Sequence, residues 1–195
     1  MEGIEPSSGV LETLILPMNY TPKTYTNIIY HFQFFVNNNL LFTLNFDIII
    51  CMKKVTIYTD GSCLSNPGPG GWACILMHNE KYKEISGAEA NTTNNRMEMR
   101  AIIEAIKALK VPCEVELYSD SAYVINAFNQ NWIESWEKNN WKNSQRKPVL
   151  NYDLWIELLE VLKYHKVNFN KVKGHSDNIY NNRCDELARS KASQL

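Results

Sequence analysis

The order of strand-like and helical patterns after residue 52 is the feature that most restricts the fold of this chain. Three strand-like runs come first, at about 53–60, 71–78 and 81–89, separated by residues that favour turns. A helix is predicted from Asn94 to Lys110, with Thr92 or Thr93 as its N-cap and Pro112 beyond its end. The later patterns are strands at about 114–119 and 166–172 and helices at about 121–128, 132–140, 151–164 and 179–193. This order predicts an α/β fold in which helices pack on the faces of a mixed sheet.

Residues 1–51 differ in composition from the rest of the chain. They contain one lysine and four acidic residues, for a net charge of −3, whereas the remainder carries a net charge of +2. An apolar, aromatic stretch runs from Ile28 to Cys51, but polar residues interrupt it before it reaches the roughly 20 residues that a membrane-spanning helix needs. We therefore expect no membrane association. We expect 1–51 to be an extension, either disordered or the result of a mis-assigned start, and 52–195 to form one domain that begins at Met52.

The cysteines and the charge distribution bear on the environment and the partner. The five cysteines form neither a C-x-x-C pair nor a Cys/His cluster with zinc-ligand spacing, so free thiols in a reducing cytoplasm are expected. If four acidic residues of the second part bind metal, the surface that remains is basic and suits a polyanion. Nothing in the sequence indicates an obligate subunit interface, so we expect a cytoplasmic monomer.

Four acidic residues that are far apart in the chain stand in segments that direct them toward a common site. Asp60 ends the first strand-like run, and Asp120 directly follows the run at 114–119. Glu98 and Asp185 each lie on the apolar stripe of a predicted helix, with Ala101, Ile102, Ala105 and Leu109 in the first and Ala188 and Ala192 in the second. Carboxylates gathered in this way repel one another strongly, and hard divalent cations relieve the repulsion. The set therefore predicts a metal centre.

The chemistry of such a centre follows from its ligands. Carboxylates are ligands that Mg²⁺ and Mn²⁺ prefer, whereas zinc sites favour histidine and cysteine. Two such ions about 4 Å apart can clamp the attacking and leaving oxygens of a phosphodiester. His175 lies in a loop ten residues before Asp185, where it is a candidate for proton handling or product release. Each residue alone has an ordinary explanation, such as a turn, a helix-dipole charge or a solvated loop. The combination carries the functional interpretation.

A second group of residues points to the partner. Trp132, Trp136 and Trp141 fall within ten residues and are flanked by Lys138, Lys142, Arg146 and Lys147. The tryptophans are explained either by a local core that anchors a protruding pair of helices or by contact with a ligand. The basic residues suit a ridge that follows phosphates. Uncharged polar groups that suit a minor groove with 2′-hydroxyls stand near the predicted carboxylates, at Asn66, Thr93, Asn94 and Asn95.

Several motifs of this chain resemble those of bacterial type 1 ribonuclease H. They follow the family order and spacing, at Thr59–Cys63, Asn66–Gly71, Thr92–Glu98, Ser119–Ser121 with Tyr123, Lys173–His175 and Asn182–Ala188. The resemblance covers 52–193 and leaves 1–51 aside. It implies a ribonuclease H-like α/β fold with a five-stranded mixed sheet, whose first three strands are antiparallel, and helices on both faces. The domain at 52–195 would then be the catalytic domain.

The resemblance also implies an activity. The family consists of endonucleases that hydrolyse the RNA strand of RNA–DNA hybrids with two Mg²⁺ ions, or with Mn²⁺, and leave 3′-hydroxyl and 5′-phosphate ends. By position, Asp60 would be shared by both ions, Glu98 and Asp120 would hold one, Asp185 would hold the other, and His175 would handle protons or product release. Groove and phosphate contacts would fall to Cys63, Asn66, Thr93, Asn94 and Asn95. The basic protrusion that grips the DNA strand would include Trp132, Trp136, Lys138 and Lys142.

Two departures from the family pattern concern substrate binding: Ala122 replaces a glutamine, and the run 137–140 replaces a tight basic cluster. Two alternatives remain, a related two-metal nuclease of the same fold and a catalytically weak hybrid-binding module. The Asn94–Asn95 pair and the tryptophan-rich segment count against the first. The complete set of four carboxylates counts against the second, because a binding module gains nothing from mutually repelling acids.

Overall fold

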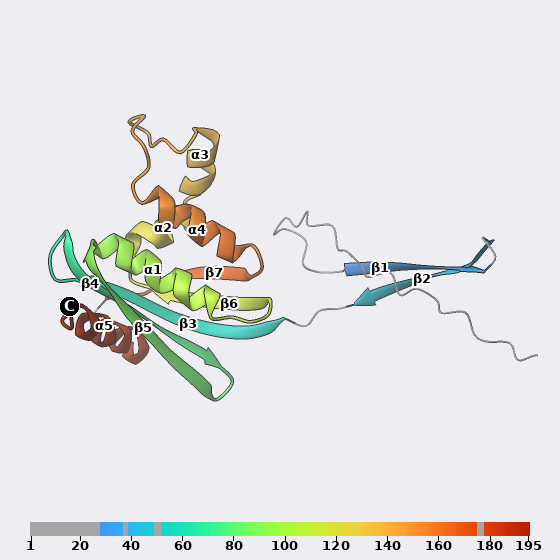
Figure 1. Ribbon diagram of the computed structural model, residues 1–195, viewed down its shortest axis with the longest axis horizontal. Coiled ribbons are helices and arrows are strands. Elements are labelled where there is room, and N and C mark those ends of the chain that lie inside the picture. Colours follow the sequence, from blue (N-terminus) through green and yellow to red (C-terminus); the bar gives the residue numbers. More distant parts are fainter. Residues whose placement is uncertain (1–27, 37–38, 49–51, 175–177) are drawn as a thin grey trace, which may run out of the picture.

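The computed structural model of the 195-residue chain describes residues 28–36, 39–48, 52–174 and 178–195. Its main sheet has five strands in the order β5-β4-β3-β6-β7 (Figure 1). The first three in sequence are antiparallel neighbours: β3 (Lys53–Cys63), β4 (Gly68–His78) and β5 (Lys81–Thr92). The last two continue the sheet in parallel: β6 (Cys113–Ser119) beside β3 and β7 (Lys166–Lys171) beside β6. The predicted mixed α/β fold is therefore confirmed.

Helices cover both faces of this sheet (Figure 1). The helices are α1 (Asn94–Lys107), α2 (Ala122–Asn129), α4 (Tyr152–Leu162) and α5 (Ile179–Ala192), and α3 (Trp132–Lys138) protrudes from the domain beside α2. The larger core joins α1, α2 and α4 to one face through fully buried residues such as Ile57, Ile102 and Leu158. On the other face α5 packs Cys184 and Ala188 against β4. Successive side chains of β3 and β6 point to opposite faces of the sheet, so these strands contribute residues alternately to the two faces.

Close contact between α5 and the sheet depends on Gly71. A Cβ atom at this position would lie 2.0 Å from the carbonyl oxygen of Ala188 and 2.7 Å from the backbone nitrogen of Ala192. Only a residue without a side chain lets the helix lie this near to β4. The small residues Ala188 and Ala192 on the facing stripe of α5 are fully buried for the same reason.

Several element boundaries differ from the predicted ones: β4 begins at Gly68 and not at about 71, and β5 ends at Thr92 and not at about 89. β3 continues to Cys63, past the predicted end at Asp60, because its last residues pair through their backbones with β4. α1 ends at Lys107, so Leu109 packs on the core from beyond the helix and does not belong to its stripe. α3 ends at Lys138, and the chain then takes left-handed backbone angles, with φ of 57° at Trp141.

Within residues 1–51, the structure describes two strands, β1 (Ile28–Val36) and β2 (Asn39–Ile48), which form a separate antiparallel two-stranded sheet (Figure 1). The other residues of this segment lie outside the described part of the chain. The expectation that 1–51 is an extension apart from the domain stays a prediction. Among the residues that the structure describes, no helix has the length and apolar character that a membrane span requires.

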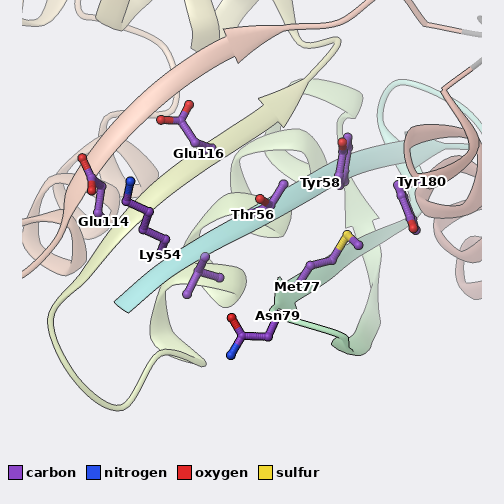
Figure 2. A pocket seen from close by; sticks show the side chains of 9 residues that line it. Lys54, Thr56, Tyr58, Met77, Asn79, Glu114, Glu116 and Tyr180 are labelled. Carbon is purple, nitrogen blue, oxygen red and sulfur yellow. The ribbon is translucent and has the colours of Figure 1, made fainter. Parts of the chain in front are cut away.

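A cavity of about 530 Å³ lies over β3 and β6, next to the start of α5 (Figure 2). Its lining includes Lys54, Thr56, Tyr58, Glu114, Glu116 and Tyr180. Tyr58 and Tyr180 close the end next to α5, with ring centroids 5.2 Å apart. The carboxylates of Glu114 and Glu116 have partners on β7. Lys166 forms an ion pair with Glu114 at 2.8 Å, and the side-chain amides of Asn168 and Asn170 donate hydrogen bonds to Glu116. The cavity is thus a solvent-facing side of the sheet with both charged and apolar lining, the latter including Val55 and Met77.

Candidate active site

The four carboxylates predicted from the sequence meet in one pocket. The pocket has a volume of about 280 Å³ and is lined by Asp60, Gly61, Ser62, Asn94, Glu98, Asp120, Asn181, Asp185 and Arg189. These residues come from β3, α1, the end of β6 and α5, which are far apart in the sequence. The parallel pairing of β3 with β6 brings Asp60 and Asp120 to the same end of the sheet, since Thr59 is paired with Ser119.

Asp60 is the most deeply placed of the four. It lies within β3, where its backbone is paired with that of Ala73 in β4, and it is 7% exposed. Its Oδ1 accepts a hydrogen bond of 2.7 Å from the backbone N–H of Gly61. Burial, followed by the charge of Asp120, raises the pKa of Asp60 to about 8, although the Gly61 hydrogen bond opposes this change. A carboxylate in this position needs a cation to be ionised at neutral pH.

Glu98 is fixed by two hydrogen bonds, one from its own helix and one from the start of α2. The Asn94 side-chain amide, one turn earlier in α1, donates to Oε1 at 2.8 Å, and the Ser121 hydroxyl donates to Oε2. Burial raises the pKa of Glu98 to about 7, with a further rise from Asp120, and these two hydrogen bonds act against the rise. Ser121 also caps α2 by accepting from the N–H of Val124 at 3.3 Å. One hydroxyl therefore joins the start of α2 to the carboxylate on α1.

The start of α1 is positioned by the loop between β3 and β4. Thr93 is the N-cap residue, as predicted, but its side chain makes no capping hydrogen bond. The side-chain oxygen of Asn66 instead accepts from the N–H of Asn94 at 2.8 Å. On the other side of the helix terminus, Gly61 is in close contact with the α1 backbone, and a Cβ atom there would lie 2.2 Å from the Glu98 nitrogen. The spacing between Asp60 and Glu98 depends on both contacts.

α5 contributes the remaining polar groups. The Asp185 side chain is 15% exposed and forms an ion pair with Arg189 one turn later. Asn181, one turn before Asp185, is 2% exposed, and its buried Oδ1 has no hydrogen-bond partner among the residues that the structure describes. A buried polar atom without a partner is costly, and such atoms often mark a functional site. Arg189, Asn181 and Ser121 were not predicted as site residues, although the spacing of four between Asp185 and Arg189 is visible in the sequence.

The donor set fits hard divalent cations. It consists of carboxylate oxygens with one orphaned amide oxygen nearby, and two of the carboxylates have pKa values that burial and mutual repulsion have raised. In the described part of the chain no three histidine, cysteine or acidic side chains already form a cluster that would hold an ion. Glu98 and Asp185 are instead held by Ser121 and Arg189. Ser121 can keep its hydrogen bond to Glu98 when a cation binds, since each carboxylate oxygen has two lone pairs, whereas the positively charged Arg189 would have to release Asp185.

The raised pKa values predict how metal-free stability depends on pH. The folded protein keeps protons on Asp60 and Glu98 that the unfolded chain releases above its ordinary pKa values near 4, so the free energy of unfolding falls as pH rises from about 4 to about 8. A bound divalent cation removes this penalty. We therefore expect the gain in melting temperature from Mg²⁺ over EDTA to be larger at pH 8 than at pH 5.

Thermal unfolding at both pH values, with and without Mg²⁺, checks this. Comparing the two metal conditions at each pH cancels the opposite contribution of His165, whose pKa is lowered by burial. A gain that is equal at the two pH values, or larger at pH 5, would contradict the expectation.

The other predicted site residues lie around the pocket or outside the described chain. His175 is not among the described residues. Asn95 is exposed next to the pocket residue Asn94, and the Cys63 thiol lies 2.7 Å from the carbonyl oxygen of Ser65 and 3.5 Å from that of Thr92. Lys138 and Lys142 are exposed at or just after the end of α3. The structure therefore gathers the carboxylates and Asn94 in the pocket and leaves the basic residues at a separate surface.

The tryptophans of the protruding segment pack together and onto the core. Trp132 and Trp136 are partly buried, with ring centroids 6.2 Å apart, and Trp136 meets the fully buried Trp155 of α4 at 5.3 Å. Trp141 continues the cluster at 6.3 Å from Trp136. Of the two explanations offered by the sequence, a local core that anchors the protrusion accounts for these contacts. A role of Trp132 and Trp136 in substrate binding stays a prediction.

Comparison with known proteins shows which family this chain resembles in sequence and fold. The RNase H family profile matches residues 52–193. Ribonuclease H of Caldicellulosiruptor saccharolyticus is 60% identical over 144 residues, which cover 74% of this chain and 99% of that protein. Among solved structures, LC9-RNase H1, a type 1 RNase H with the type 2 active-site motif, superimposes with a TM-score of 0.68 at 26% identity, covering 74% of each chain. LC11-RNase H1, solved in complex with an RNA/DNA hybrid, shares the fold with a TM-score of 0.56 at 23% identity, covering 72% of this chain and 97% of that one.

The fold and the carboxylate pocket thus define an α/β nuclease domain of the ribonuclease H class. The chain belongs to the ribonuclease H family, as a bacterial type 1 member, and residues 1–51 lie outside the matched region.

Proposed function

We propose that this protein is an endonuclease that hydrolyses the RNA strand of RNA–DNA hybrids and leaves 3′-hydroxyl and 5′-phosphate ends. The observation that carries the proposal is the meeting of Asp60, Glu98, Asp120 and Asp185 in one pocket of a ribonuclease H domain. Burial raises the pKa values of Asp60 and Glu98, which is unfavourable for folding, so the arrangement is explained by its chemistry.

The four carboxylates are proposed to hold two Mg²⁺ ions, with Mn²⁺ as an alternative. Asp60 would be shared, Glu98 and Asp120 would serve one ion and Asp185 the other. When bound, the ions would activate water and stabilise the charge on the phosphodiester oxygens. The chain itself supplies the alignment: Ser121 and Asn94 orient Glu98, and Gly61 orients Asp60 through its N–H group. His175 is proposed to handle protons or product release.

Recognition of the hybrid is proposed to use groups on two sides of the pocket. Asn94 lines it, and Cys63, Asn66, Thr93 and Asn95 surround the same helix terminus, where uncharged polar groups suit a minor groove with 2′-hydroxyls. On the other side, Lys138 and Lys142 stand on a protrusion that the packed tryptophans Trp132 and Trp136 hold rigid, and they are proposed to follow DNA phosphates. We propose that the domain at 52–195 acts in this way as a monomer in the cytoplasm.

A substrate panel tests the proposed function. Labelled RNA–DNA hybrid, double-stranded RNA and double-stranded DNA of one sequence are incubated with the protein at equal salt. We expect cleavage of the hybrid alone. Cleavage of duplex DNA would favour a related two-metal nuclease, and binding of the hybrid without cleavage would favour a binding module; either result would overturn the proposal.

A further inference from the structure

α5 presents three polar side chains to the carboxylate pocket at successive turns. Asn181, Asp185 and Arg189 are four residues apart, so they share one face of the helix, and all three line the pocket. Two of them have already been described: Asp185 is one of the four carboxylates, and Asn181 is buried with a side-chain oxygen that lacks a hydrogen-bond partner among the described residues. Arg189 is different, because it places a positive charge in a pocket whose carboxylates suit the binding of metal cations.

The contact of Arg189 is with the carboxylate itself. Its guanidinium nitrogen Nη2 forms both a hydrogen bond and an ion pair with Oδ2 of Asp185. The Asp185 side chain is 15% exposed and that of Arg189 is 58% exposed, so the arginine reaches in from the open side of the pocket. A guanidinium stays charged at every pH at which a protein is folded. The interaction with Asp185 is therefore always available to compete with another cation.

From this geometry we propose that Arg189 is a positioning residue that holds Asp185 in the metal-free protein and releases it when a divalent cation binds. The inference rests on the proposed function, because it takes Asp185 as a metal ligand. It follows that Arg189 lowers the affinity of the site for Mg²⁺ in two ways. It occupies an oxygen that the ion needs, and it places a like charge within a few ångströms of the ion.

The exposure of Arg189 indicates that this exchange is easily made. Ion pairs with one well-exposed partner contribute little to stability, so giving up the contact costs the fold little. The long side chain can turn toward solvent without disturbing α5, whose buried stripe consists of other residues, among them Cys184 and Ala188. Removal of Arg189 should therefore act on cation affinity far more than on folding.

Titration of the full chain with Mg²⁺ alone, followed by calorimetry, tests the proposal. For Arg189→Gln we expect Mg²⁺ to bind between about three-fold and ten-fold more tightly than to the wild-type protein, as loss of one nearby like charge implies. Arg189→Lys, which keeps the charge but loses the planar fork, should fall between the two. The matched control is Arg183→Gln on the same helix, because Arg183 pairs with Glu84 and Glu186 and does not line the pocket. Its Mg²⁺ affinity should equal that of the wild type.

Metal-free melting temperatures measured in parallel separate this role from a structural one. Tighter Mg²⁺ binding by Arg189→Gln, with a melting temperature close to that of the wild type, supports the proposal. Unchanged or weaker binding by Arg189→Gln, while the wild type binds Mg²⁺ and cleaves hybrid, overturns this inference and leaves the proposed function standing. A wild-type protein that neither binds Mg²⁺ nor cleaves hybrid would overturn both.

Discussion

Asp60→Asn is expected to lower the rate of hybrid cleavage by roughly a thousand-fold or more and, at the same time, to stabilise the metal-free protein at pH 8. The first effect follows because a metal centre contributes several kcal/mol to the transition state, and each 1.36 kcal/mol is a factor of ten in rate. The second follows because burial and the neighbouring Asp120 raise the pKa of Asp60 to about 8, so removing the charge relieves repulsion in the folded state. We expect a gain of at least about 1 kcal/mol in the free energy of unfolding.

Cleavage rates under single-turnover conditions and urea unfolding in EDTA measure the two effects. Glu160→Gln is the matched control, because Glu160 is 60% exposed on α4, pairs with its neighbour Lys163 and lies outside the pocket. It should change neither quantity appreciably. An Asp60→Asn protein that keeps its activity would refute the role of Asp60. One that is less stable than the wild type in EDTA would refute the electrostatic account of the pocket.

Gly61→Ala is expected to damage both the fold and the site. The added Cβ atom would lie 2.2 Å from the Glu98 nitrogen and 2.3 Å from the Met97 carbonyl carbon, so the start of α1 must move away from β3. Forcing extra volume into a packed site typically costs about 1–3 kcal/mol of stability, and we expect the upper end here because the contacts are with rigid backbone. The shift also separates Asp60 from Glu98. Cleavage should therefore fall by roughly a hundred-fold even at temperatures where the variant is folded, since small misplacements of catalytic groups have effects of this size.

Gly68→Ala provides the comparison for this effect. Its Cβ atom would meet mainly the hydroxyl group of Ser65, which can rotate away, and not the backbone of a helix. Urea unfolding and cleavage rates should therefore show a clearly smaller loss for Gly68→Ala than for Gly61→Ala. Equal losses in the two variants would mean that the contact between Gly61 and α1 does not set the geometry of the site.

Much of the fold was predictable because strands and helices leave different periods in the sequence. The alternation in 114–119 and the helical stripe of Ala101, Ile102 and Ala105 correspond to buried faces in the structure. The end of β3 was not predictable in this way. Gly61, Ser62 and Cys63 have no apolar alternation, and they continue the strand only because β4 supplies backbone partners. The left-handed backbone after α3 also leaves no periodic signal.

The sequence was enough to predict the four carboxylates of the site, but not the hydrogen bonds that orient them. Asp60, Glu98, Asp120 and Asp185 stood out because acidic residues at the ends or on the apolar faces of elements are costly unless they are used. The groups that orient them were harder to find. Ser121 and Asn66 have ordinary roles at turns and helix starts, and their hydrogen bonds to Glu98 and α1 arise only when distant segments are brought together.

The most direct measurement uses an RNA–DNA hybrid in which each strand carries its own label, incubated with the protein in Mg²⁺ or in EDTA. We expect cuts in the RNA strand only, with 3′-hydroxyl and 5′-phosphate ends, and no cutting in EDTA. Cleavage of the DNA strand, or cleavage of RNA that continues at the same rate in EDTA, would contradict the proposed function.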